Sequence, residues 1–233
     1  MTGQLSSRLR SIRARIAAAA AAAGRDENSV TLVAVSKGQP AAALQELAHL
    51  GVEHFGESYL QEGLPKLEAL AGMELTWHYI GRLQANKTRA VAERFAWVHG
   101  VDRQRIAERL AAQRPPYAAP LNVCLQVKLQ ADDTKGGVDA AAAAALATAV
   151  AAMPRLRLRG LMCMLPEGLA AAAQRERFDA VAALAASLRS RGHDLDTLSM
   201  GMSGDFEAAI AAGATLVRVG SALFGSRTAT TSP

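Results

Sequence analysis

The chain has 233 residues and a mass of 24.4 kDa, which is enough to bury a hydrophobic core without disulfide or metal cross-links. Half of its residues are hydrophobic, 20% are charged and its mean hydropathy is +0.08, so the composition excludes disordered, collagen-like and membrane-spanning classes. The net charge of +5 suits an anionic small ligand as well as nucleic acid, and charge alone does not choose between them.

The N-terminal segment resembles a secretory signal, because arginines are followed by an alanine run at 17–23. Its leucines and isoleucines, however, recur between the arginines at helical spacing, at positions 5, 9, 12 and 16. A signal sequence would place its charges first and its apolar residues together afterwards. The segment therefore predicts an amphipathic helix over about 4–24 of a cytoplasmic protein.

Short β-branched runs alternate with longer alanine-rich segments along the rest of the chain. The pattern predicts eight strands, at 31–36, 52–55, 77–80, 97–100, 122–127, 157–162, 197–200 and 215–219. It predicts helices between them, at 41–50, 60–71, 86–95, 103–113, 138–153, 175–191 and 205–212. A helix between successive strands implies a parallel sheet, and eight units predict a single TIM-type (β/α)8 barrel with an extra N-terminal helix.

A doubly wound open sheet is the alternative fold. No GxGxxG follows the first predicted strand, as the dinucleotide-binding version of that fold would require. We therefore expect one barrel domain over 1–227, followed by a flexible tail at 228–233.

Functional side chains of such a barrel lie where its strands end, and the first of these places holds Lys37. Strand parity puts Lys37 on the same face as Val33 and Val35, which can be the barrel interior. Apolar surroundings disfavour an ammonium ion, and the neutral amine is a nucleophile toward an aldehyde. The alternative is a lysine that extends from the strand end into solvent.

Glycines and hydroxyls follow the seventh and eighth predicted strands, in the loop 199–204 and at Gly220 and Ser221. Glycine lets backbone amides approach a ligand, and this pair of loops is the usual phosphate site of a barrel. Either loop alone could simply make a tight turn and a helix cap. Together with an interior lysine, the two loops favour a phosphorylated aldehyde.

Arg218 lies inside the last predicted strand, where a charge among β-branched residues needs a partner. One candidate partner is a neighbouring carboxylate such as Asp205. The other is a pyridine nitrogen of a ligand, which Arg218 would keep unprotonated because a guanidinium only donates hydrogen bonds.

Other polar positions carry weaker signals. His78 could be an acid or base, but we expect a core histidine with one hydrogen bond. The cysteines, Cys124 and Cys163, lie in apolar runs, which favours buried thiols in a reducing compartment. No group of residues has the spacing of a metal site. We expect four methionines to pack the barrel mouth, namely Met162, Met164, Met200 and Met202.

Seven segments in fixed order closely resemble the pyridoxal phosphate homeostasis proteins, over residues 6–227. They are LVAVSK at 32–37, FGESYLQE at 55–62, WHYIGRLQANK at 77–87, TKGG at 134–137, GLM at 160–162, LSMGMSGDFE at 198–207 and VRVGS at 217–221. The resemblance implies a barrel like the N-terminal domain of alanine racemase that carries pyridoxal 5′-phosphate.

The resemblance also implies roles for individual residues. Lys37 would form the internal aldimine, Arg218 would face the pyridine nitrogen and Met200 would approach the ring. The residues implied to hold the phosphate are Ser203, Gly204, Gly220 and Ser221. The family usually has FGEN where this chain has FGES, so Ser58 replaces an asparagine and can need a water molecule to reach the cofactor. Lys87 and Lys135 fall in the shared segments without an implied role.

The function implied is that of a non-catalytic monomer that buffers the cofactor or delivers it to apo-enzymes, without nucleic acid or membrane as partner. A racemase-like enzyme is one alternative, and a cofactor-free Schiff-base aldolase is another. Racemases of this fold take a second acid–base group, a tyrosine, from an additional C-terminal domain, and we expect none of the three tyrosines here to replace it.

Overall fold

The computed structural model describes residues 2–128 and 136–225, so Lys135 and the predicted tail at 228–233 lie outside the described residues. The strands are β1 (Thr31–Val35), β2 (His54–Glu57), β3 (Thr76–Tyr79), β4 (Trp97–Val101), β5 (Leu121–Lys128), β6 (Val138–Asp139), β7 (Leu156–Met162), β8 (Thr197–Ser199) and β9 (Leu216–Val219). The helices are α1 (Thr2–Ala22), α2 (Ala41–His49), α3 (Leu60–Ala69), α4 (Thr88–Arg94), α5 (Gln104–Gln113), α6 (Ala140–Ala151), α7 (Ala171–Ser190), α8 (Phe206–Ala211) and α9 (Ser221–Phe224), with a 3-10 turn, η1 (Ala85–Lys87), before α4. Within the described ranges, no helix is long and apolar enough to cross a membrane.

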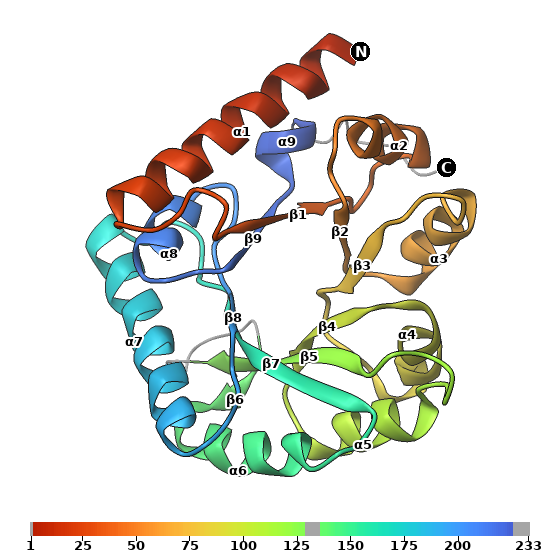
Figure 1. Cartoon of the computed structure of the whole chain (residues 1–233), viewed down its shortest axis with the longest axis vertical. Helices are drawn as coiled ribbons and strands as arrows, with labels where there is room; N and C mark the ends of the chain where they lie inside the picture. Colours follow the sequence, from red (N-terminus) through yellow and green to blue (C-terminus); the bar gives the residue numbers. More distant parts are fainter. Residues whose placement is uncertain (1, 129–135, 226–233) are drawn as a thin grey trace.

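The sheet is a closed ring surrounded by helices (Figure 1). Its strands run in the order β4-β3-β2-β1-β9-β8-β7-β5, all pairings are parallel, and pairing of β4 with β5 closes the ring. The two-residue β6 pairs only with the end of β5. The predicted TIM-type barrel is confirmed, and closure brings the carboxyl ends of all eight strands to one mouth.

β2 begins at His54 rather than at Val52, where the sequence predicted it. Val52 completes the end of α2 instead. Its amide donates to the Leu47 carbonyl at 3.0 Å, and the Gly51 amide donates to the Ala48 carbonyl at 2.9 Å. These two bonds form a Schellman motif, which requires the positive φ of 78° that Gly51 adopts. Val52 is therefore buried as part of a helix end and not as part of the sheet.

Two predicted helices also begin elsewhere. α6 begins at Ala140, because Val138 and Asp139 pair with the end of β5. α7 begins at Ala171, because the alanines before Arg175 are themselves strong helix formers. The single turn of α9 was not predicted.

The predicted amphipathic helix α1 lies on the outside of the barrel, beside α8 and α9 (Figure 1). Its apolar stripe is buried, at Leu5, Leu9, Ile12 and Ile16. The arginines between these residues bind the ends of other helices: Arg8 donates to the Phe224 carbonyl and Arg13 to the Gly51 carbonyl, both at 2.7 Å. The charges that resemble a signal sequence thus attach α1 to the barrel, where cations favour helix C-termini.

Three histidines form a hydrogen-bonded chain inside the barrel. His54 Nδ1 lies 2.9 Å from His78 Nε2, and His78 Nδ1 lies 2.9 Å from His99 Nε2, on three successive strands. His99 Nδ1 lies 2.7 Å from Ser199 Oγ of β8. The expectation of one hydrogen bond for His78 was therefore wrong, because a histidine on each neighbouring strand faces it.

The side chains of Val33, Trp97, Cys124, Met162 and Leu216 form a separate apolar cluster within the ring.

A buried ion pair joins α3 to β2, behind the end of β1. Lys66 Nζ lies 2.7 Å from Glu57 Oε1 and donates to the Ser36 carbonyl oxygen at 2.7 Å. Ser36 Oγ donates to the same Glu57 oxygen at 2.5 Å. Glu57 is 0% exposed, and its Oε2 has no hydrogen-bond partner among the residues described. The pair fixes the hydroxyl and the carbonyl of the residue that precedes Lys37.

Replacing Lys66 by methionine should lower the free energy of unfolding by about 3–5 kcal/mol, because it leaves the Glu57 carboxylate buried without its cation. Urea unfolding of the purified variant measures this loss. The matched control is Arg175→Met, which breaks the exposed ion pair with Asp179 and should cost less than about 1 kcal/mol. Equal losses in the two variants would contradict a structural role for the buried pair.

Stability should fall as the pH is lowered from 7 to 5. Burial, with Arg218 nearby, lowers the pKa of His99 to about 3, and burial with the two neighbouring rings lowers the pKa of His78 well below its usual value. Below the unfolded-state pKa of about 6.5, the unfolded chain binds protons that the folded barrel does not. Two such groups should cost about 2 kcal/mol between pH 6 and pH 5. Urea unfolding across this range should show the loss, and His99→Gln should reduce its slope by roughly half; a flat profile would contradict neutral buried histidines.

Candidate functional site

A cavity of about 450 Å³ opens at the carboxyl ends of the strands. Six of the eight predicted site residues line it: Ser58, Ser203, Gly204, Arg218, Gly220 and Ser221. They come from β9 and from the turns that follow β2, β8 and β9. Parallel closure therefore brings together residues that are up to 163 positions apart in the sequence.

The two loops that were predicted to bind phosphate lie against one another. The Ala222 amide donates to Ser203 Oγ at 3.3 Å, which links the start of α9 to the loop after β8. Gly201 in that loop has a φ of 95°, and a Cβ there would lie 2.7 Å from the Ala209 Cβ, so a side chain is excluded. A Cβ on Gly204 would meet nothing within 4 Å, so its backbone faces open space. The two loops thus offer amides and hydroxyls to an anion in the cavity.

Arg218 lines the same cavity, although only 3% of the residue is exposed. Its Nη1 donates to Ser199 Oγ at 2.6 Å, and its Nη2 donates to the Cys163 carbonyl oxygen at 2.8 Å. Burial lowers the pKa of Arg218, but a guanidinium stays protonated in proteins. The structure therefore holds a cation at the cavity wall, with two of its N–H groups bound from behind.

Asp205 is the carboxylate that the sequence offered as a partner for Arg218. Its Oδ1 instead accepts the Met202 amide at 2.5 Å. Burial raises the pKa of Asp205, while that amide and the charge of Arg218 act in the opposite direction. Asp205 lines the cavity and closes the turn before α8, whereas the two Arg218 side-chain hydrogen bonds go to Ser199 and to the Cys163 carbonyl oxygen.

Lys37 follows β1 and is partly buried. Its Nζ donates to the Tyr59 hydroxyl at 3.4 Å and lies 4.6 Å from the centre of that ring. The chain on either side is held in place: Ser36 by the Lys66–Glu57 pair, and Gly38 by an amide bond to Glu62 Oε2 at 2.7 Å. The amine thus extends from a fixed backbone, and it does not line the 450 Å³ cavity in this conformation.

A second cavity, of about 710 Å³, adjoins the first and shares Ser58, Ile80 and Met164 with it. Tyr59 and Lys87 line this second cavity, so the Lys37 amine lies beside it through its contact with Tyr59. The side chains of Ile80 and Met164 form an apolar boundary between the two spaces.

Met200 is fully buried in the main core and does not line either cavity. Of the other mouth methionines, Met164 and Met202 line the first cavity and Met162 is buried inside the ring.

Among the described residues, no group of three or more histidine, cysteine or acidic side chains could hold a metal ion. Both cysteines are buried, and burial raises the pKa of Cys124 to about 12, so that thiol is inert.

Three residues of the buried polar networks next to the site were not predicted from the sequence: Lys66, His54 and His99. Strand parity carried a signal for the histidines, because each lies on a predicted strand or at its edge at a position that can face inward. Lys66 carried no such signal, since a lysine in an amphipathic helix is usually solvated.

The chain matches the family model for the alanine racemase N-terminal domain over residues 7–228. It is 53% identical over 216 residues to the pyridoxal phosphate homeostasis protein of Pseudomonas aeruginosa, which covers 93% of each chain. It is 47% identical over 222 residues to the protein of the same name from Escherichia coli, which covers 94% of this chain and 95% of that one.

Solved structures agree with these matches. PipY of Synechococcus elongatus, solved with PLP bound, has a TM-score of 0.84 and 40% identity over 95% of this chain and all of its own. Alanine racemase of Corynebacterium glutamicum shares the fold, with a TM-score of 0.67 and 19% identity over 94% of this chain and 61% of its own. The chain thus belongs to the pyridoxal phosphate homeostasis protein family, built on the fold of the alanine racemase N-terminal domain.

Proposed function

We propose that this protein binds pyridoxal 5′-phosphate reversibly as a Schiff base with Lys37, and buffers it or delivers it without catalysing a reaction. The observation that carries the proposal is the 450 Å³ cavity, where two loops rich in amides and hydroxyls adjoin a buried guanidinium and apolar walls. This set of donors suits a compound that carries both a phosphate and an aromatic ring with a nitrogen acceptor. The PLP-bound relative with 40% identity supports the same ligand.

In this proposal the phosphate lies between the loop after β8 and the turn after β9. The donors are the amides and hydroxyls of Ser203, Gly204, Gly220 and Ser221, all of which line the cavity. Charge-assisted hydrogen bonds from several groups to one dianion are strong and selective. The loops are joined by the bond between Ala222 and Ser203, so the donors are already grouped before a ligand arrives.

Arg218 would donate to the pyridine nitrogen and keep it unprotonated. Bound cofactor supplies an electrophilic carbonyl carbon and a conjugated ring that can accept electrons. A ring held by a guanidinium accepts electrons poorly, which favours holding the cofactor over transforming an amino acid. Arg218 suits this role because its orientation is set by Ser199 and the Cys163 carbonyl.

Lys37 would reach the cavity by rotating its side chain away from Tyr59, about a backbone that Lys66 and Glu62 hold in place. The bound cofactor would supply an aldehyde carbon to which the Lys37 amine would add with loss of water, so no further reactant would be needed. Ser58 lines the cavity and would contact the cofactor directly or through a water molecule. We also propose that Met200, which is packed behind the loop, approaches the ring when the cofactor is bound.

Two alternatives differ in observable ways. A cofactor-free aldolase would show no visible absorption, whereas a bound pyridoxal Schiff base would. A racemase-like enzyme would turn over amino acids in a manner that depends on Lys37. In the proposed function the protein acts in the cytoplasm as a monomer, and its recipients are apo-enzymes that require the cofactor.

Borohydride reduction of the cofactor-loaded protein should fix one pyridoxyl group on Lys37, because hydride converts the C=N bond to a stable secondary amine. Peptide mass mapping locates the group. Lys37→Ala should lose the label and the visible band, whereas Lys87→Ala at the neighbouring cavity should keep both. A label on Lys87 or Lys135 with Lys37 unmodified would overturn the assignment.

Pyridoxal without its phosphate should bind far more weakly than pyridoxal 5′-phosphate. Each lost hydrogen bond to a charged group is worth about 1.5–3 kcal/mol, so removing several predicts at least a hundredfold difference, about 3 kcal/mol. Absorption titration measures both affinities. The double variant Ser203→Ala, Ser221→Ala should reduce the ratio of the two affinities by at least about a hundredfold, since two donors to the phosphate are lost. Equal affinities of the wild-type protein for the two compounds would show that the two loops do not bind the phosphate.

A further inference from the structure

A continuous hydrogen-bonded chain connects the two ends of the barrel interior. It runs from His54 through His78 and His99 to Ser199, over distances of 2.9, 2.9 and 2.7 Å. Ser199 Oγ in turn accepts a hydrogen bond from Arg218 at 2.6 Å. Arg218 lines the mouth cavity, whereas His54 begins β2 at the opposite end. Of this hydrogen-bonded series, the proposed function uses only Arg218, and it gives no role to Ser199 or to the three histidines.

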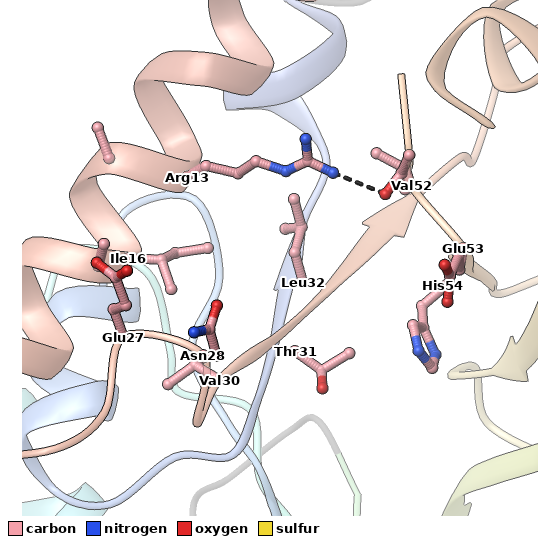
Figure 2. A pocket seen from close by; sticks show the side chains of 13 residues that line it. Arg13, Ile16, Glu27, Asn28, Val30, Thr31, Leu32, Val52, Glu53 and His54 are labelled. Carbon is pink, nitrogen blue, oxygen red and sulfur yellow. Dashed lines mark hydrogen bonds between the residues drawn. The ribbon is translucent and has the colours of Figure 1, made fainter. Parts of the chain in front are cut away.

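The end at His54 opens on a different cavity, of about 670 Å³, shown in Figure 2. In Figure 2, His54 and Glu53 lie beside Thr31, on the far side of this space from α1. His54 is partly buried, so its ring closes the chain at the border of solvent. Burial lowers the pKa of His54 and Glu53 opposes this effect. The hydrogen-bonded chain of side chains therefore has one end, Arg218, at the mouth of the barrel and the other end, His54, at the opposite opening.

Arg218 sets the direction of every bond in the chain. A guanidinium only donates, so Ser199 Oγ accepts a hydrogen bond from Arg218. Among the described residues, His99 Nδ1 is the only acceptor that the Ser199 hydroxyl hydrogen reaches, so Ser199 donates to His99. With Nδ1 accepting, a neutral His99 carries its hydrogen on Nε2 and donates to His78. By the same reasoning His78 donates from Nε2 to His54. All three rings thus have the Nε2–H form, and the donors point from Arg218 toward the amino end.

Burial keeps this arrangement from relaxing. His78, His99 and Ser199 are all 0% exposed, so water does not compete for their polar atoms. Each of these groups has its partners within the chain, and losing one would leave a buried donor or acceptor unpaired. Hydrogen bonds in such a series polarise one another, so a change at one end alters the next bond.

We propose that His54, His78, His99 and Ser199 are positioning residues, which hold the Arg218 guanidinium in one orientation at the mouth cavity and connect it to the opposite opening. A change in the acceptor at His54 should therefore reach Arg218 through three intervening groups. The effect on cofactor binding rests on the proposed function, whereas the hydrogen-bonded series from His54 to Arg218 is a property of the protein without ligand.

The first test uses the ligand-free protein labelled with nitrogen-15. Scalar couplings across the hydrogen bonds should connect His54 to His78 and His78 to His99, and all three rings should have the Nε2–H form. His54→Asn keeps an acceptor near the Nδ1 position and should keep the His78–His99 coupling and the Arg218 side-chain resonances. His54→Leu removes the acceptor and should shift the resonances of His99 and Arg218.

The control is His49→Leu, an exposed histidine at the end of α2, which should leave these resonances unchanged. Two results would overturn the proposal. One is the Nδ1–H form in His78 or His99 of the wild-type protein. The other is an unshifted Arg218 in a folded His54→Leu variant.

The second test measures pyridoxal 5′-phosphate affinity and the visible band of the bound cofactor. Changes along such a network alter coupling by about 0.5–2 kcal/mol, so His54→Leu should weaken binding by about two- to thirtyfold and shift the band. His54→Asn and His49→Leu should bind like the wild-type protein. If the resonances shift as expected but the affinity and the visible band do not change, the hydrogen-bonded network is confirmed and its effect on the cofactor is contradicted. If the wild-type protein does not bind the cofactor at all, the proposed function fails instead.

Discussion

Arg218 carries a positive charge into the interior of a parallel barrel, where 3% of the residue meets solvent. A guanidinium in such surroundings is unfavourable unless its N–H groups find acceptors. Ser199 Oγ and the Cys163 carbonyl supply two of them. Ser199 then has its own hydrogen to place, and three histidines carry this requirement down the barrel to its other opening. Much of the polar interior thus follows from the burial of one cation.

A second buried cation organises the neighbouring part of the mouth. Lys66 Nζ contacts Glu57 Oε1 and the Ser36 carbonyl, both at 2.7 Å, directly before Lys37. A compact ammonium can direct its hydrogens to two such oxygens, whereas a planar guanidinium needs acceptors arranged for its fork. This distinction helps to explain a lysine here in a chain that has only five among 26 basic residues. The two lysines differ in their surroundings: Lys66 is buried between α3 and β2, whereas Lys37 is partly exposed and its amine contacts the Tyr59 side chain.

The closed barrel and its outer helix could be predicted from the sequence, because both depend on local hydrophobic periodicity. The stripe at Leu5, Leu9, Ile12 and Ile16 predicts which face of α1 is buried, and the buried residues agree. The start of β2 could not be predicted in this way. Val52 is as apolar as a strand residue, but the left-handed Gly51 before it makes it part of a helix end.

The order of residue types along the chain is enough to predict which chemistry the mouth of the barrel can offer. The glycines and serines of two loops, the lysine after β1 and the arginine in β9 are visible as residue types in fixed order, since the ends of parallel strands meet at one edge. How these groups are held in place depends on contacts between residues that are distant in the sequence. His54, His78, His99 and Ser199 become one chain only when β2, β3, β4 and β8 enclose a common interior. Hydrogen-bond partners that are up to 100 residues apart depend on the closure and register of the whole ring, which no local pattern encodes.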